Sequence, residues 1–135
     1  MRTTVEVGQE LPSLTVSLSR VDLARYAGAS GDFNPIHYND AAAAALGLPG
    51  VIAHGMLTMG MGLRVVTDWV GDPAQVMSYF VRFTKPVVVP PVGAAEVTFT
   101  AKVTGIADSV ATISVGAMCG DDKVLGAAVA EVRLG

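Results

Sequence analysis

The stretch HGMLTMGMGLRVVTDWV, residues 54–70, is the longest helical pattern in the chain. Its apolar residues fill one broad side, and the other side carries few charges. A helix that is apolar nearly all round is expected to be buried. Gly60 and Gly62 each cost about 1 kcal/mol relative to alanine inside a helix, which favours close approach of a neighbouring backbone. We therefore predict a buried helix over His54–Val70.

Strand patterns follow this helix to the end of the chain. Val76–Phe83 alternates apolar and polar residues, and the two prolines of Val87–Pro91 keep that segment from lying in mid-sheet throughout. Further alternating patterns lie at residues 97–103, 111–117 and 123–134. Short turns at Asp108-Ser109 and at Gly120–Asp122 join the later strands, so the sheet should be largely antiparallel. The residues alone thus predict one buried helix followed by a sheet.

A short strand and two helices are expected before residue 50. Leu14–Leu18 alternates as a strand. Ser19 then begins a helix, and Asp22, three positions later, can complete a capping box. Gly28 is placed to end that helix, and a second, alanine-rich helix is expected over Ala41–Leu46.

The loop between these two helices, SGDFNPIH at Ser30–His37, puts a carboxylate and an imidazole five positions apart. Asn34 favours turns, and Pro35 pushes the residue before it out of the helical region. Histidine titrates near neutrality and a nearby carboxylate can orient it, so Asp32 and His37 form an acid–base pair in outline. The alternative is structural, because Asp32 and Asn34 can also close turns or cap a helix.

The residues of this loop also match a known family. Tyr26–His37, together with Ala43, resembles the hydratase motif of the MaoC-like dehydratases and (R)-specific enoyl hydratases. Ala53–Met56 is similar to the second landmark of that family, the start of its central helix. The resemblance covers nearly the whole chain. It is strongest for the B-type subunit of the actinobacterial 3-hydroxyacyl-carrier-protein dehydratase of type II fatty acid synthesis, through His54–Gly60 and Trp69–Pro73.

The resemblance implies an α+β hot-dog fold, in which a largely antiparallel sheet wraps a long central helix. It also implies a hydro-lyase that reversibly removes water from an (R)-3-hydroxyacyl thioester to give a trans-2-enoyl thioester, in fatty acid or related acyl-chain metabolism. The substrate would be an acyl-CoA or acyl-ACP thioester, and no cofactor is expected. We expect His37 to take the C2 proton and Asp32 to serve the leaving water, a division of roles that the sequence leaves open.

Gly55 is expected to contact the thioester oxygen. The first amides of a helix have no partner within it, and the helix dipole favours negative charge there. Because Gly55 has no side chain, an oxygen can approach its N–H closely, and the family places its oxyanion contact at the matching glycine. The alternative is that packing alone requires a glycine at this position.

Three further residues are expected to contact the substrate, whereas His54 is not. Asn34 matches the family residue that helps to hold the active-site loop. Ser30 is expected either to hydrogen-bond the acid–base pair or to close a turn. Met56 is expected to contact the acyl chain, or else to fill the core. His54 is interpreted as structural, because it precedes the central helix and can satisfy buried polar groups.

Two other functions on the same fold remain as alternatives. Hot-dog thioesterases commonly use a carboxylate on the central helix, but His54–Thr67 contains no Asp or Glu. A non-catalytic subunit would be expected to lack the acid–base pair, whereas this chain has both Asp32 and His37. Two histidines without a third ligand at regular spacing make a poor metal site, so no metal is expected.

Composition favours a single domain, expected over residues 1–135, that associates with another subunit. The chain is 51% hydrophobic and 16% charged, whereas typical domains are about 45–50% apolar and about 25% charged. This excess favours apolar surface hidden in an oligomer. The resemblance implies a homodimer, or a heterodimer with a related hot-dog subunit.

Charge and sequence pattern also exclude several classes of protein. The net charge is −3 with no basic cluster, which argues against nucleic-acid binding. No uninterrupted apolar run of the length of a membrane span occurs. Residues 1–6 lack the apolar core of a signal peptide, and the single Cys119 cannot form an internal disulfide. The chain is therefore expected in the cytoplasm.

Overall fold

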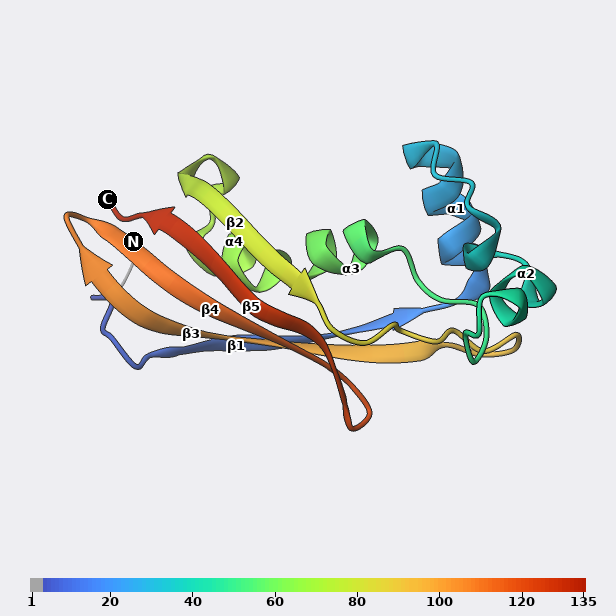
Figure 1. Cartoon of the computed structure of the whole chain (residues 1–135). Coiled ribbons are helices and arrows are strands. Elements are labelled where there is room, and N and C mark those ends of the chain that lie inside the picture. Colours follow the sequence, from blue (N-terminus) through green and yellow to red (C-terminus); the bar gives the residue numbers. More distant parts are fainter. Residues whose placement is uncertain (1–3) are drawn as a thin grey trace.

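The computed structural model describes residues 4–135. The expectation about a signal peptide falls partly on residues 1–3, which lie outside the described residues. Within residues 4–135, five strands form one antiparallel sheet in the order β1-β3-β4-β5-β2 (Figure 1). The strands are β1 (Glu10–Leu18), β2 (Val76–Phe83), β3 (Ala95–Ala107), β4 (Val110–Cys119) and β5 (Asp122–Arg133).

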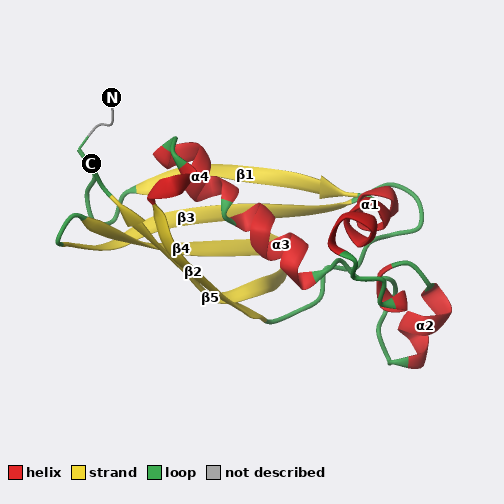
Figure 2. Ribbon diagram, turned by 90° about the horizontal axis from the view of Figure 1, so that it is seen from above, coloured by secondary structure: helices red, strands yellow, loops and turns green. Residues whose placement is uncertain are grey.

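The helices of the described chain lie on one face and at one end of this sheet. They are α1 (Arg20–Ser30), α2 (Asp40–Ala45), α3 (Gly55–Gly62) and α4 (Arg64–Val70), with short 3-10 helices at Pro35–His37 and Pro73–Gln75. α3 and α4 run across the sheet, and α1 and α2 lie beyond one end of it (Figure 2). This is the α+β hot-dog fold that the resemblance implied. No helix in the described part of the chain has the length and apolar run needed to cross a membrane.

The core lies between the sheet and the α3–α4 segment. The alternation predicted for β3 and β4 is confirmed, because on each strand every second side chain is buried. These side chains are Val97, Phe99, Ala101 and Val103 on β3 and Ala111, Ile113, Val115 and Ala117 on β4. Burying an apolar side chain of valine size or larger contributes about 1.5–3 kcal/mol, so these rows hold the sheet against the helices.

The prediction of one buried helix over His54–Val70 was partly wrong. The helical segment divides at Leu63 into α3 and α4, and its exposed positions recur every fourth residue. These positions are Met56, Gly60, Arg64 and Asp68. A Cβ at Gly62 would lie 3.0 Å from the Tyr79 hydroxyl, whereas a Cβ at Gly60 would meet nothing within 4 Å. Close approach therefore explains Gly62 alone, and side chains rather than a backbone make that approach.

The first helix begins as predicted and ends later than predicted. Ser19 and Asp22 form the capping box, with each side chain accepting from the other's backbone N–H. α1 continues past Gly28 to Ser30 and ends at Gly31, whose φ of 78° is the left-handed conformation that glycine adopts at helix ends. The three extra residues bring the end of α1 directly to the loop that carries the acid–base pair.

Candidate active site

The loop after α1 is built from hydrogen bonds between neighbouring residues. The Ser30 hydroxyl accepts a hydrogen bond from the Asp32 N–H at 3.1 Å, and Asp32 Oδ1 accepts one from the Asn34 N–H at 3.2 Å. Asn34 Oδ1 in turn accepts from the Ile36 N–H at 3.3 Å, which caps the 3-10 helix Pro35–His37. Ser30 thus closes a turn, and Asn34 holds the loop.

These turns bring the side chains of Asp32 and His37 to face each other. His37 Nε2 lies 3.9 Å from Asp32 Oδ2. This separation exceeds a direct hydrogen bond, and one polar atom of a substrate or a water can reach both groups. The His37 side chain is 8% exposed and that of Asp32 is 51% exposed. The pair therefore presents a buried imidazole beside a carboxylate that solvent reaches.

A backbone carbonyl fixes the proton on His37. His37 Nδ1 lies 2.8 Å from the Ile52 carbonyl oxygen. A carbonyl can only accept, so Nδ1 carries the hydrogen and the Nε2 of the neutral ring has a free lone pair. That lone pair faces Asp32. The ring is therefore held in the tautomer that a proton-accepting role at Nε2 requires.

The Ile52 carbonyl is itself held by a short pairing of two segments outside the five strands. Ile52 and Val88 form an isolated antiparallel bridge. On either side of it, the Ala53 N–H donates to the Val87 carbonyl at 2.9 Å and the Val89 N–H donates to the Val51 carbonyl at 2.9 Å. Val87–Pro91 is the segment whose two prolines were predicted to keep it from lying in mid-sheet throughout. In the described structure it forms only this isolated bridge. The sequence pattern did not single out Ile52, because it acts on His37 through its main-chain carbonyl and not through its side chain.

His54 is buried in contact with both members of the pair. Its side chain is 1% exposed, and its Nε2–H donates to the Asp32 backbone carbonyl at 3.2 Å. Its ring stacks on His37 with 3.8 Å between centroids, and Tyr26 packs edge-on against it at 4.7 Å. Burial lowers the pKa of His54, and the nearby His37 lowers it further, while the Asp32 backbone contact acts in the opposite direction. His54 is therefore held as a neutral ring at neutral pH.

Gly55 is the first residue of α3 and lies beside a cavity that also reaches His37. The cavity has a volume of about 310 Å³, and its lining includes Thr58, Phe83 and Val124. A Cβ at Gly55 would lie 3.1 Å from the Phe83 ring, so the ring covers this glycine closely. The cavity thus extends from His37 to the first residue of α3.

Met56, the next residue of α3, does not lie at this cavity. It is 62% exposed on the outer stripe of α3, and it is not part of the cavity lining. Neighbouring helix residues point about 100° apart, which is why Gly55 lies at the cavity and Met56 lies outside it. Of the predicted site residues, only His37 and Gly55 line this cavity; the others are Ser30, Asp32, Asn34 and Met56.

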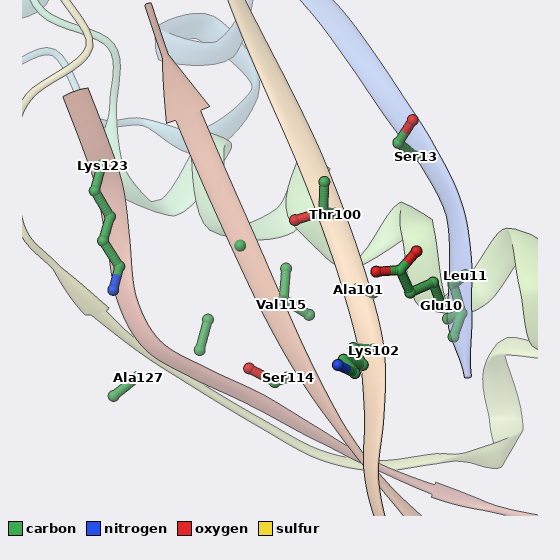
Figure 3. A pocket seen from close by; sticks show the side chains of 12 residues that line it. Glu10, Leu11, Ser13, Thr100, Ala101, Lys102, Ser114, Val115, Lys123 and Ala127 are labelled. Carbon is green, nitrogen blue, oxygen red and sulfur yellow. The ribbon is translucent and has the colours of Figure 1, made fainter. Parts of the chain in front are cut away.

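A second hollow, of about 500 Å³, lies on the opposite face of the sheet (Figure 3). Its polar side chains include Glu10, Lys102, Ser114 and Lys123, all on strands (Figure 3). Lys102 and Ser114 alternate with buried residues of β3 and β4, so the hollow opens to solvent away from α3 and α4. None of the predicted site residues lines it.

Asp32, His37 and His54 each offer one potential metal-ligand atom, and these atoms lie within 4.8 Å of one another. Residue spacing did not reveal this cluster, because it depends on the fold. Hydrogen bonds to backbone carbonyls already occupy His37 Nδ1 and His54 Nε2. The three side chains thus form a compact cluster of one carboxylate and two imidazoles, with one nitrogen of each ring hydrogen-bonded to the main chain.

Comparisons with known proteins place this geometry in a family. A model of the MaoC-like domain matches residues 3–118 of the chain. The 3-hydroxyacyl-thioester dehydratase X of Mycobacterium tuberculosis is 40% identical over 79 residues, which are 58% of this chain and 27% of that protein. The 3-oxo-4,17-pregnadiene-20-carboxyl-CoA hydratase beta subunit of the same organism is 30% identical over 109 residues, which are 81% of each chain.

A solved structure described as a MaoC-like dehydratase superposes with a TM-score of 0.94 at 41% identity. The match covers 97% of this chain and 41% of that one. The chain thus spans less than half the length of dehydratase X and of this solved chain. The family match and the similarity to the beta subunit each extend over most of the sequence, and the chain therefore belongs to the MaoC-like domain family.

Proposed function

We propose that the chain catalyses the reversible dehydration of (R)-3-hydroxyacyl thioesters to trans-2-enoyl thioesters, in fatty acid or related acyl-chain metabolism. The observation that carries the proposal is the free Nε2 of His37, facing Asp32 at 3.9 Å beside a cavity that reaches Gly55. The names of the relatives, a thioester dehydratase and a CoA hydratase subunit, support it. The substrate would be carried by coenzyme A or acyl carrier protein, which favours a cytoplasmic reaction.

In this proposal His37 Nε2 removes the proton from C2 of the acyl chain. The electron pair of the broken C–H bond forms the C2–C3 double bond, and the C3–O bond breaks. Asp32 either protonates the departing hydroxyl or positions it to receive the proton that His37 has taken from C2, and in both cases the hydroxyl leaves as water. In the reverse direction the same two groups activate water for addition to C3.

The third requirement is a donor for the negative charge that grows on the thioester oxygen. The first amides of α3 have no partner within the helix, and the dipole of α3 favours negative charge at its start. The His54 side chain makes no capping hydrogen bond to these amides. The N–H of Gly55 at the cavity is therefore our candidate donor. Removing one such donor in other enzymes costs about 2.7–4 kcal/mol of transition-state stabilisation.

A substitution at Gly55 separates this role from simple packing. Gly55→Ala is expected to lower kcat/KM by at least about 10-fold, because a methyl group would keep the thioester oxygen from the N–H. The same methyl would press on the Phe83 ring at 3.1 Å. The double variant Gly55→Ala/Phe83→Leu relieves that contact, and Phe83→Leu alone controls for changes in the cavity. Recovery of activity in the double variant would mean that Gly55 is needed only for packing.

The reaction itself is tested with crotonyl-CoA as the enoyl thioester. Hydration is expected to remove the absorbance of the conjugated enoyl group without releasing free thiol. Release of free thiol would instead identify a thioesterase. The absence of both changes, in folded protein at any concentration tested, would favour the non-catalytic subunit.

We also propose that the chain works as a dimer, with itself or with a related hot-dog subunit. β2 is an edge strand of the described sheet and exposes the apolar side chains of Met77, Phe80 and Phe83. An exposed edge of this kind pairs readily with another chain. The printed name of one relative, a beta subunit, supports a heteromeric arrangement.

At micromolar concentration, light scattering is expected to give the mass of at least a dimer. Phe80→Glu, which places a charge on the β2 edge, is expected to shift the mass towards a monomer. Val92→Glu is the matched control, because Val92 is also exposed, at 87%, but lies outside the strands. A monomeric wild-type protein would contradict self-association and leave the companion subunit as the dimer partner.

A further inference from the structure

His54 lies where the three parts of the proposed reaction meet. Its ring stacks on His37 with an interplanar angle of 24°, and its Nε2–H donates to the backbone carbonyl of Asp32. It is also the residue before Gly55, whose N–H is the candidate oxyanion donor. One buried residue thus contacts the proposed base, the residue that carries the proposed acid, and the start of α3.

The contact with His37 completes the orientation of that ring. The hydrogen bond from His37 Nδ1 to the Ile52 carbonyl fixes one ring atom but allows rotation about the line between the two atoms. The flat face of His54, 3.8 Å away, fixes the plane of the His37 ring. Together the two contacts determine where His37 Nε2 points.

The contact with Asp32 acts on its backbone. The local turn, through Asn34, holds the Asp32 carboxylate but does not connect the loop to the rest of the fold. The hydrogen bond from His54 Nε2 connects the Asp32 backbone to the residue before α3, across 22 residues of sequence. The far end of the loop is connected separately, through the bonds of Ile36 and His37 to Ile52. His54 therefore sets the position of the Asp32 backbone relative to the ring of His37.

The charge state of His54 fits the same role. Its Nε2 carries the hydrogen because a carbonyl can only accept, and its Nδ1 is buried without a hydrogen-bond partner in the described residues. A second proton, on Nδ1, would give the ring a positive charge that is buried and unpaired, which is strongly unfavourable. A neutral ring also avoids repelling the positive charge that His37 gains when it accepts the C2 proton.

We infer that His54 is a positioning residue for the proposed dehydration, holding the ring of His37 and the backbone of Asp32 at the separation and angle that the proton transfers require. The inference rests on the proposed function for its kinetic consequence. The positions that it assigns to the His37 ring and the Asp32 backbone do not depend on which reaction the chain catalyses. A displacement of reacting groups by about 1 Å can reduce a rate by about 100-fold, so losing these contacts should reduce kcat on that scale.

The kinetic test uses three variants that separate the effects of two contacts, the stacking on His37 and the hydrogen bond to the Asp32 carbonyl. His54→Phe keeps a flat ring and loses the donor, His54→Gln keeps a donor and loses the ring, and His54→Ala loses both. We expect kcat for crotonyl-CoA hydration to fall by about 100-fold in His54→Ala and by a smaller factor in the other two, with KM within about twofold of the wild-type value. Rates are expressed per folded molecule, with folding followed by circular dichroism.

Ile113→Ala is the control for lost stability, because Ile113 is fully buried on β4 and lies outside the site. It is expected to lower the melting temperature and leave kcat unchanged. Values of kcat within about threefold of wild type in all three His54 variants would overturn the inference, as would equal losses in all three. If His54→Ala does not fold, the comparison of His54→Phe and His54→Gln with wild type decides the same point.

The geometric test needs no substrate. The chain contains only two histidines, so ¹⁵N-histidine labelling yields NMR signals from His37 and His54 alone. We expect His54 to remain neutral with its proton on Nε2 from about pH 7 to pH 8, and His37 to carry a proton on Nδ1. In His54→Gln, which lacks the stacking ring, the remaining histidine signals should broaden as His37 loses its fixed plane.

A His54 that gains a second proton in this range, or a His37 signal unchanged in His54→Gln, would overturn the inference even in an active enzyme. The expected spectra from a protein without hydratase activity would instead contradict the proposed function and leave the geometry standing. The two failures are therefore distinguishable.

Discussion

Replacing His37 with alanine is expected to reduce kcat for crotonyl-CoA hydration by about 10²–10⁴-fold, the usual contribution of a positioned general base. Nε2 of His37 is the only nitrogen of that ring free to take a proton, because Nδ1 donates to the Ile52 carbonyl. The ring is buried, faces the Asp32 carboxylate and lines the cavity. Steady-state kinetics by enoyl absorbance measures the loss.

A matched variant separates loss of the base from loss of structure. His37→Asn offers a side-chain N–H near the position of Nδ1, so the hydrogen bond to the Ile52 carbonyl can persist without a base at Nε2. We expect His37→Asn to melt close to the wild-type temperature and to be as inactive as His37→Ala. Activity above about one tenth of wild type in folded His37→Asn would remove His37 from the mechanism.

Asp32→Asn is the second substitution with a large expected effect, a loss of at least about 100-fold in kcat. The change removes the negative charge and the capacity to release a proton. It keeps the size of the side chain and an oxygen that can accept from the Asn34 N–H, so the turn should persist. The measurement is again kcat for hydration, with the melting temperature as a check on folding.

Asp40→Asn is the control for loss of a surface carboxylate. Asp40 pairs with Arg20, whose hydrogen bonds hold the pKa of that carboxyl below its usual range, and it does not line the cavity. It should retain wild-type kcat. The double variant Asp32→Asn/His37→Asn should be little worse than either single variant, because residues that act as a unit show strongly non-additive losses. Additive losses would mean that the two groups act in separate steps.

The elements of the fold that sequence predicted best are those set by local pattern. The Ser19–Asp22 capping box and the alternation of β3 depend on residues within a few positions of each other, and both are confirmed. The end of α1 was predicted too early. Gly28 is tolerated inside the helix with no neighbour within 4 Å of its would-be Cβ, and the left-handed position falls at Gly31 instead.

The site was harder to predict where its contacts are long-range. The proximity of Asp32 and His37 followed from a short loop of turn-forming residues, and the structure brings the two side chains together. The role inferred for His54 did not follow, because its partner Asp32 lies 22 positions away and accepts through a backbone carbonyl. Met56 was expected to contact the acyl chain or else to fill the core, but the rotation of one helical residue from Gly55 turns it outward.

The pairing of Ile52 with Val88 has a consequence for how such a site can evolve. Any amino acid at position 52 offers the same carbonyl oxygen to His37, so this interaction would persist through substitutions of Ile52, which also lines the cavity. Mutational tolerance at this position would therefore conceal its importance. Proline at position 53 or 89 would reveal it, since each removes an amide that secures the bridge.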